Sequence, residues 1–343
     1  MYGCCKKEKP PIARSLIKKV GRKESNLLER LVPILLVTSI GFALALGSMW
    51  QRIKNLESTV GIKVAGLPAQ AGTKVATAGN TQTSGTTSEI QKEILPSNYK
   101  LGIRFNDAIT KMVQMGAIDK DKFIKLYEER SPLTESQKKL LESSSGDEIV
   151  LNADNAQLIL NLLWPLGISN KAKVLSEGPM GTQYKDEIDN FASTAGWTLG
   201  KTEGGKLFNS LSIISLTPQE ENLVKEIAES IYRPCCGNHT GFPDCNHGAA
   251  MLGFIELAIS QGMSKDEIYK KALVLNSYWF PQNYAELATY FKAQKGIAWK
   301  DVNPKEMLGV NYSSGQGYAA INKELQAEGL LPKAQGGGGG CGV

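Results

Sequence analysis

The stretch Tyr232–Gly248, YRPCCGNHTGFPDCNHG, gathers the side chains of this chain that suit soft-metal or thiol chemistry. It contains three of the six cysteines and both histidines of the chain, namely Cys235, Cys236, His239, Cys245 and His247. Thiolates and imidazoles together suit Zn(II) or Cu(I), and they do not suit Mg²⁺ or Ca²⁺. Four of these ligands would satisfy a tetrahedral ion, which leaves one of the adjacent Cys235 and Cys236 as a spare. We therefore predict a metal site here, with no C-x2-C pair to decide between Zn(II) and Cu(I).

The residues around the cysteines predict a loop between two helices. Pro234 stops the preceding helix because its ring removes a backbone donor, and Gly237-Asn238 and Thr240-Gly241 are turn-forming pairs. A second helix should begin near Asp244, which we expect to cap that helix and not to bind a metal. Cys245 then falls in the first turn, where unpaired N–H groups and the helix dipole favour a thiolate.

Two other chemistries fit the same cysteines. A structural disulfide would staple the loop and leave one thiol over, with Cys341 as a source of a fourth cysteine. A thiol–disulfide exchange protein would use Cys235 or Cys236 together with Cys245. Cys341 follows the flexible run Gly336–Gly340, so its thiol either reaches the Cys/His site, forms a mixed disulfide, or belongs to an inert tail.

The rest of the chain offers no second set of catalytic residues. It has no G-x-S-x-G elbow, and the glycine-bounded turn at residues 193–200 has no phosphate-loop lysine. Both histidines lie in the Cys/His stretch, which leaves none for a separate hydrolase triad. We assign no catalytic residue and expect a binding protein, not a hydrolytic enzyme.

Leu31–Trp50 is an uncharged apolar run, LVPILLVTSIGFALALGSMW, preceded by a basic segment. As a helix it would span about 30 Å, the thickness of the hydrocarbon core of a bilayer. Because the basic residues precede it, we expect a single-pass membrane anchor with the N-terminus in the cytoplasm and the body outside. A cleaved signal peptide, with Ala43-Leu44-Ala45 near its cleavage site, is the alternative. The excess of positive over negative charge lies in this basic segment, so we expect no nucleic-acid partner.

Composition divides the chain into segments. Residues 65–88 are rich in Ala, Gly, Thr and Ser, which cannot bury enough apolar surface to fold and therefore predict a tether. The predicted segments are a basic cytoplasmic segment (1–30), a transmembrane helix (31–50), a helix end with a low-complexity linker (51–98), a helical domain (99–216), a helical domain with the Cys/His cluster (217–332) and a glycine-rich arm (333–343).

Apolar spacing and capping residues predict an all-α or nearly all-α body. The helices expected are Ile103–Met115, Lys120–Glu129, Thr134 to about Glu142, Asn155–Leu166, one from Thr217, one from Ser264, and about Asn283–Ala293. Leu211–Leu216 and Ile149–Leu151 are the two short strand candidates. We expect an aromatic cluster to pack against the Cys/His loop: Asn276, Tyr278, Trp279, Phe280 and Tyr284.

The segment from Cys235 to Phe280 resembles two bacterial families. Pro234-Cys235-Cys236-Gly237, a helix near Cys245 and the turn from Gly262 to Ile268 are similar to the PCYCGC-motif lipoproteins and to the thiol-reducing helical hairpin of cytochrome c maturation. The resemblance implies a cysteine-rich loop, a helix, a turn and a second helix. The chain lacks the C-x-x-C of the hairpin and the alternating C-x-C-x-C of the lipoproteins.

The sequence as a whole predicts a membrane-anchored, extracytoplasmic protein that binds or handles Cu(I) or Zn(II). The first alternative is a thiol–disulfide exchange protein. The second is a structural protein of the cell envelope whose cysteines staple a loop with a disulfide.

Overall fold

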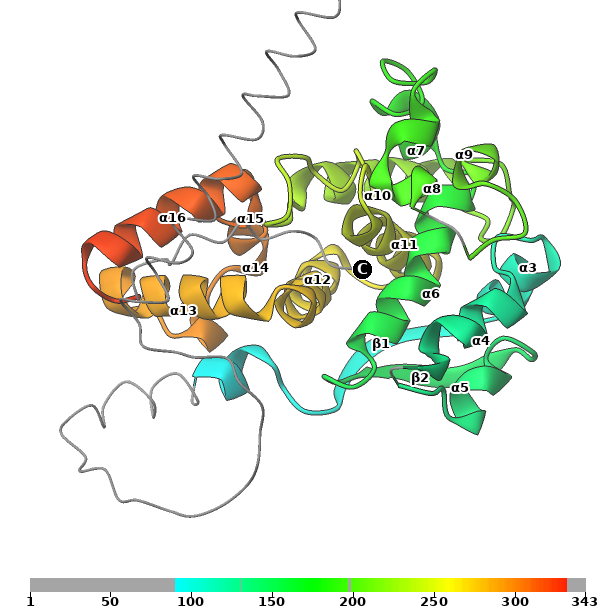
Figure 1. The fold of residues 1–343 in the computed structure, drawn as a ribbon. Helices are drawn as coiled ribbons and strands as arrows, with labels where there is room; N and C mark the ends of the chain where they lie inside the picture. The colour runs from blue at the N-terminus through cyan, green and yellow to red at the C-terminus, as the bar shows by residue number, and fades with distance from the viewer. Residues whose placement is uncertain (1–89, 130, 197–198, 332–343) are drawn as a thin grey trace, which may run out of the picture. The chain divides into compact units, whose positions relative to one another are not determined.

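The helix signals of the sequence produce helices along most of the residues that the computed structural model describes, which are 90–129, 131–196 and 199–331 (Figure 1). The prediction of a mostly helical body is confirmed. The elements in chain order, with η for a 3-10 helix, are β1 (Tyr99–Asn106), α3 (Ala108–Gln114), α4 (Lys120–Glu128), α5 (Glu135–Lys139), β2 (Ser145–Leu151), α6 (Ala156–Ser169), α7 (Lys173–Glu177), η1 (Ile188–Asn190), α8 (Ala192–Ala195), α9 (Gly204–Leu207), α10 (Pro218–Ser230), α11 (Asn246–Ser260), α12 (Lys265–Trp279), α13 (Pro281–Lys295), η2 (Trp299–Asp301), α14 (Pro304–Met307), α15 (Val310–Ser313) and α16 (Gly315–Ala327).

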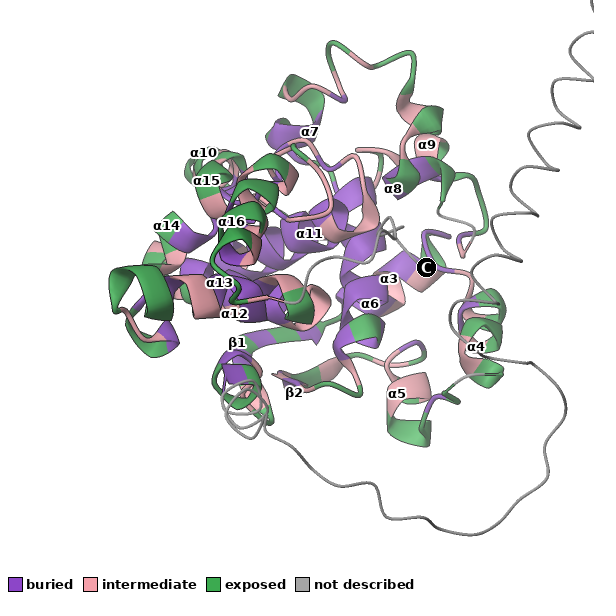
Figure 2. Ribbon diagram, turned by 60° about the vertical axis from the view of Figure 1, so that its left-hand side comes forward, coloured by how far each residue is buried: buried purple, intermediate pink, exposed green. Residues whose placement is uncertain are grey.

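Two helices that are apolar on nearly every side form the centre of the fold. Almost all residues of α6 and α11 are buried (Figure 2), as expected for helices that are stable only inside a protein. A Cβ atom added to Gly167 of α6 would lie 1.9 Å from the carbonyl oxygen of Ala249, and one added to Gly253 of α11 would lie 2.4 Å from that of Leu163. The two backbones touch because both residues are glycine. This contact fixes the position of α11.

The other helices surround this pair within one core. Packing contacts join α12 to α13 and α14, and α13 to α16. Buried apolar residues from Ile90 to Leu325 form one continuous cluster, so the segments 99–216 and 217–331 share their core. Ile90 and Ile94 belong to it as well, which shows that the folded body begins inside the segment 51–98 that was predicted as a linker.

The prediction of a helix over Ile103–Met115 is wrong in its first part, because β1 occupies Tyr99–Asn106 and the helix α3 begins only at Ala108. Leu101, Ile103 and Phe105 are buried and alternate with exposed residues. This spacing of two is the signature of a strand, and the apolar residues of the following helix concealed it.

β1 pairs with β2 in an antiparallel two-stranded sheet, so the body is not all-α. The strand candidate Ile149–Leu151 lies inside β2 and is confirmed. The candidate Leu211–Leu216 is not a strand, since the structure gives only one isolated bridge there, between Leu211 and Asn170. The backbone N–H and C=O groups of Arg104 in β1 bond to the side chain of Gln261.

Capping residues located several helix ends correctly. Thr134 and Thr217 each form a full capping box at the start of α5 and α10. The side chain of Ser264 accepts a hydrogen bond from the backbone N–H of Glu267 at the start of α12. Gly296 ends α13 in the left-handed conformation that glycine adopts at little cost.

Three predicted segments lie wholly outside the described residues: the basic segment 1–30, the transmembrane helix 31–50 and the arm 333–343 with Cys341. The tether at residues 65–88 also lies outside them. Among the helices that the structure describes, none has both the length and the apolar character needed to cross a bilayer.

One carboxyl group lies within the apolar centre. Glu256 of α11 is fully buried, and its Oε2 accepts a hydrogen bond of 3.0 Å from Nδ2 of Asn170, while Oε1 has no partner among the described residues. The Oδ1 atom of Asn170 accepts the backbone N–H groups of Ile213 and Ile214 at 3.0 and 2.9 Å. Burial raises the pKa of Glu256 well above its usual value, although the hydrogen bond from Asn170 opposes the shift.

We predict that Glu256 makes the protein less stable as the pH rises. In the unfolded chain the carboxyl of Glu256 has a pKa of about 4.3. In the folded protein the pKa is raised, so the carboxyl stays neutral to a higher pH. Its contribution to folding is therefore complete below the unfolded pKa and is lost as the pH rises through the folded pKa. Glu256→Gln removes the ionisable group. The free energy of unfolding of this variant in urea should therefore rise relative to that of the wild type between pH 5 and pH 8.

The control is Glu93→Gln, which removes an exposed carboxyl. An equal difference between Glu256→Gln and the wild type at both pH values would contradict a carboxyl held neutral by burial.

Candidate metal centre

The Cys/His loop leaves the end of α10 and folds back onto it. Ile231 is the C-cap of α10. Its carbonyl oxygen accepts two hydrogen bonds from Thr240, one from the backbone N–H at 2.8 Å and one from Oγ1 at 3.0 Å. Tyr232 and His239 form an isolated antiparallel bridge in the same place. These bonds close residues 232–239 into a loop, as the proline and the turn-forming pairs predicted.

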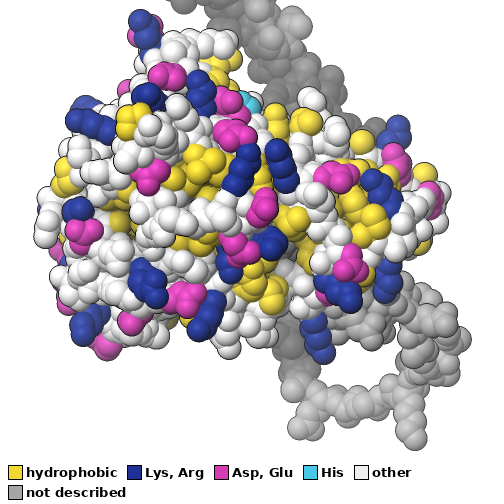
Figure 3. All heavy atoms as spheres, turned by 180° about the vertical axis from the view of Figure 1, so that it is seen from behind, with side chains coloured by type: hydrophobic (Ala, Val, Ile, Leu, Met, Phe, Trp, Pro, Cys, Tyr) yellow, Lys and Arg dark blue, Asp and Glu magenta, His cyan; other side chains and the backbone are white. Residues whose placement is uncertain are grey.

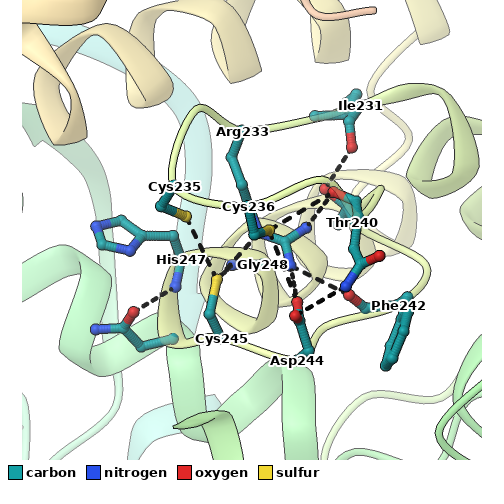
Figure 4. Close-up of polar contacts among 12 residues, drawn as sticks. Ile231, Arg233, Cys235, Cys236, Thr240, Phe242, Asp244, Cys245, His247 and Gly248 are labelled. Carbon is teal, nitrogen blue, oxygen red and sulfur yellow. Dashed lines mark hydrogen bonds and ion pairs between the residues drawn. The ribbon is translucent and has the colours of Figure 1, made fainter. Parts of the chain in front are cut away.

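The loop and the start of α11 bring two cysteines into direct contact. The Sγ atoms of Cys235 and Cys245 lie 3.7 Å apart (Figure 4). Cys245 is the N-cap of α11, and its Sγ accepts the backbone N–H of Gly248 at 3.5 Å. The sequence placed Cys245 in the first turn of this helix, and the structure places it at the residue before. All three cysteines of the loop are half-buried and free.

His247 completes a group of three ligands. One ring nitrogen of His247 and the sulfurs of Cys235 and Cys245 all lie within 4.8 Å of one another. The ring packs against Phe280 with centroids 4.4 Å apart, and against Trp279 at 6.1 Å. These two aromatic residues at the end of α12 therefore do pack against the Cys/His loop.

His239 lies apart from this group. Its ring meets the ring of Tyr232 edge-on at 5.9 Å, and it belongs to neither of the ligand groups found among the described residues. Burial lowers the pKa of His239. Of the five side chains predicted as ligands, the structure gathers Cys235, Cys245 and His247 into one group and leaves His239 out.

Cys236 belongs to a second group of three, with Asp244 and Cys245. Its Sγ lies 3.8 Å from Oδ1 of Asp244 and 3.9 Å from the carbonyl oxygen of Asn238. The expectation that Asp244 caps the helix is wrong, since Cys245 occupies the cap. The carboxylate instead accepts Nδ2 of Asn238 at 2.8 Å and forms an ion pair with Arg233.

Arg233 is the residue of this site that the sequence reading missed. It is 1 % exposed, and its guanidinium donates to four acceptors. They are Sγ of Cys245 at 3.0 Å, the carbonyl oxygen of Asn238 at 3.0 Å, the carbonyl oxygen of Phe242 at 3.2 Å, and Oδ1 of Asp244. One signal was available, because residues 90–331 use lysine for most of their cations and contain only Arg104, Arg130 and Arg233 as arginines.

The start of α11 is shaped to receive this guanidinium. A Cβ atom at Gly248 would lie 2.5 Å from Cζ of Arg233, so any side chain there would displace the guanidinium. Burial opposes the charge of Arg233, but the charges of Cys245, Cys236 and Asp244 raise its pKa above the usual value. The guanidinium is thus a fixed cation inside the loop.

The two cysteines in contact have opposite pKa shifts. Hydrogen bonds from Cys235 and Cys236 lower the pKa of Cys245 well below its usual value against the effect of burial, and Arg233 and His247 lower it further. Hydrogen bonding to Cys236 and Cys245, together with burial, raises the pKa of Cys235. These shifts favour a thiolate at Cys245 and a neutral thiol at Cys235.

A buried chain of hydrogen bonds supports the loop from the side of α12 and α13. Nδ2 of Asn276 donates to the carbonyl oxygen of Tyr232 and to the hydroxyl of Tyr284, both at 3.0 Å. The Tyr284 hydroxyl lies 2.7 Å from Oγ of Ser313. Two residues after Ser313, the backbone N–H of Gly315 donates to the carbonyl oxygen of Cys236 at 2.7 Å.

On the face shown in Figure 3, acidic and basic side chains are interspersed. A hollow of about 790 Å³ is lined by both basic and acidic residues, among them Lys122, Lys201, Lys206, Asp189 and Glu203. Lys122 bonds to the carbonyl oxygen of Gly200, and Lys206 pairs with Glu203.

No protein-family model, curated protein or solved structure gives a significant match to this chain. The local resemblance to the PCYCGC-motif lipoproteins and to the cytochrome c maturation hairpin stays a prediction.

We predict that the fold depends strongly on Arg233. Removing one partner of a buried ion pair leaves an uncompensated charge and typically costs about 3–5 kcal/mol, so Arg233→Met should lower the free energy of unfolding by that amount. Arg233→Lys should recover only part of it, because one ammonium group cannot reach all four acceptors. Urea unfolding of the reduced protein measures both.

Arg104→Met, at an exposed arginine, is the matched control and should unfold like the wild type. A wild-type midpoint for Arg233→Met would show that the guanidinium is dispensable.

Proposed function

We propose that this protein binds a single Zn(II) or Cu(I) ion through Cys235, Cys245 and His247. The proposal is carried by one observation, the mutual approach of two sulfurs and one imidazole nitrogen to within 4.8 Å at the end of a buried helix. Two soft ligands and one borderline ligand suit these ions and exclude Mg²⁺ and Ca²⁺.

The separation of the two sulfurs suits a tetrahedral Zn(II) ion and is too short for a linear Cu(I) site. Two sulfurs bound to one tetrahedral Zn(II) at about 2.3 Å each lie roughly 3.8 Å apart. Sγ of Cys235 and Sγ of Cys245 lie 3.7 Å apart, so an ion could bind between them with little movement. A linear Cu(I) site would need the sulfurs farther apart, at about twice the metal–sulfur bond length.

Arg233 selects between the two groups of ligands. The group of Cys236, Asp244 and Cys245 surrounds the guanidinium, which bonds to Asp244 and Cys245. A metal cation there would be repelled by a fixed cation only a few ångströms away. Figure 4 shows His247 and Cys235 on the other side of the Cys245 sulfur. Cys236 is therefore the spare cysteine.

Three protein ligands leave the fourth tetrahedral position open. Structural zinc sites fill all four positions with protein ligands, whereas open sites exchange water or another ligand. The three cysteines of the loop are half-buried, so solvent reaches the neighbourhood of the site. Both features fit a protein that takes up an ion and passes it on. We place this activity at the outer face of a cell membrane, with residues 31–50 as the anchor, on the charge pattern of the sequence alone.

The two histidines test the proposal because only one belongs to the ligand group. The full chain, purified with a phosphine reductant, should bind one Zn(II) per chain in competition with a chromophoric chelator. We expect His247→Ala to lose more than about 100-fold in affinity for Zn(II). Replacing a residue that only hydrogen-bonds to a metal ligand already costs about 10- to 100-fold. His239→Ala is the matched control and should bind like the wild type.

Cys235→Ser and Cys245→Ser should each lose the ion, and Cys236→Ser should keep it. The proposal fails if the wild type binds neither Zn(II) nor Cu(I) stoichiometrically. It also fails if the two histidine variants bind with equal affinity.

A further inference from the structure

The contact between Cys235 and Cys245 also suits a reaction between the two sulfurs. A disulfide bond joins sulfurs about 2.05 Å apart, and these two lie at 3.7 Å. Cys245 is fixed, because its Sγ accepts Nε of Arg233 at 3.0 Å and the N–H of Gly248 at the start of a buried helix. Cys235 lies in a turn of the loop, where rotation about its Cα–Cβ bond can carry the sulfur across the gap.

The third sulfur of the loop is placed differently. Sγ of Cys236 contacts oxygen acceptors, at 3.9 Å from the carbonyl of Asn238 and 3.8 Å from the carboxylate of Asp244. A disulfide between the adjacent Cys235 and Cys236 would force the peptide bond between them away from its planar trans form, which is costly. Sγ of Cys236 also lies within 4.8 Å of Sγ of Cys245, but Asp244 and Asn238 are among its contacts. Sγ of Cys235 lies 3.7 Å from Sγ of Cys245, so the contacts favour Cys235 as the partner of Cys245 and Cys236 as the remaining thiol.

We propose that Cys235 and Cys245 form a redox pair that exchanges with low-molecular-weight disulfides, and that closing their disulfide expels the bound ion. The metal half of this proposal rests on the function proposed above. The disulfide half stands on the contact between the two sulfurs and holds for the metal-free protein as well.

The exchange takes two steps with a small disulfide RS–SR as the oxidant. The thiolate of Cys245 attacks one sulfur of RS–SR, which forms the mixed disulfide of Cys245 with SR and releases RS⁻. The sulfur of Cys235 then attacks Sγ of Cys245, which forms the Cys235–Cys245 disulfide and releases the second RS⁻. The proton of Cys235 passes to a released RS⁻. Two protein sulfurs are oxidised and one small disulfide is reduced.

Oxidation removes two of the three metal ligands at once. A thiolate is the metal ligand, and a disulfide sulfur carries no such charge. His247 alone cannot hold the ion in the presence of water. The guanidinium of Arg233 stays in place and disfavours capture of the ion by the neighbouring Asp244. The same two sulfurs are therefore either bound to a metal or bound to each other.

The test uses the full chain with Cys4→Ser, Cys5→Ser and Cys341→Ser, so that only the three loop cysteines remain. The metal-free, reduced protein is incubated with oxidised glutathione, alkylated, and mapped by mass spectrometry. We expect three reactive thiols to fall to one, with a Cys235–Cys245 cross-link and an alkylated Cys236. Cys236→Ser should form the same cross-link, whereas Cys235→Ser should stop at a glutathione adduct on Cys245.

A second sample is loaded with one Zn(II) and given the same oxidant, and the released ion is followed with a chromophoric chelator. We expect one ion to leave for each disulfide formed. Three thiols that survive in the metal-free protein, or a cross-link through Cys236, would overturn the proposal. So would a cross-linked protein that keeps its ion. If the reduced protein binds no ion at all, the proposed metal function fails, and the cross-link map still decides whether the redox pair exists.

Discussion

The buried guanidinium of Arg233 is the interaction on which the Cys/His loop depends. It joins the end of α10, two carbonyl groups of the loop, and the first residues of α11 through four hydrogen-bonded acceptors. A loop of this length has few apolar residues to hold it, and a charge this deeply buried is stable only when all its donors are satisfied. The loop is therefore folded around the guanidinium of Arg233.

This internal cation also divides the site into two halves. Next to the guanidinium, the charges of Asp244 and Cys236 balance its positive charge. Cys235 and His247 lie on the far side of the Cys245 sulfur. The position of Cys245 matters to both halves, and α11 sets it. That helix is in turn fixed against α6 by the contact of two glycine backbones, Gly167 and Gly253.

Much of this arrangement could be predicted from the sequence, for identifiable reasons. The capping boxes at Thr134 and Thr217 are local signals, and they gave the helix starts correctly. The Cys/His stretch was recognisable from residue types alone. β1 was missed because its alternating apolar residues run directly into the apolar face of α3, and a period of two over so short a stretch is easily read as helix.

The details of the site could not be predicted because they depend on contacts outside the loop. The residues next to His239 and His247 do not show which of them belongs to the ligand group. The two differ in their packing, because the ring of His247 lies against Phe280 at the end of α12. The burial of Arg233 depends on the absence of a side chain at Gly248, fifteen positions further along the chain. Sequence reading identified a set of five side chains, and tertiary packing selects three of them.

X-ray absorption spectroscopy at the zinc edge tests the central claim most directly, since it reports the atoms bound to the ion. The full chain loaded with one Zn(II) under reducing conditions should show two sulfur neighbours at about 2.3 Å and nitrogen or oxygen neighbours at about 2.0–2.1 Å. The nitrogen shell should carry the multiple-scattering pattern of one imidazole, and it should persist in His239→Ala. A shell of oxygen and nitrogen without sulfur would contradict the account. So would an imidazole signal that disappears with His239.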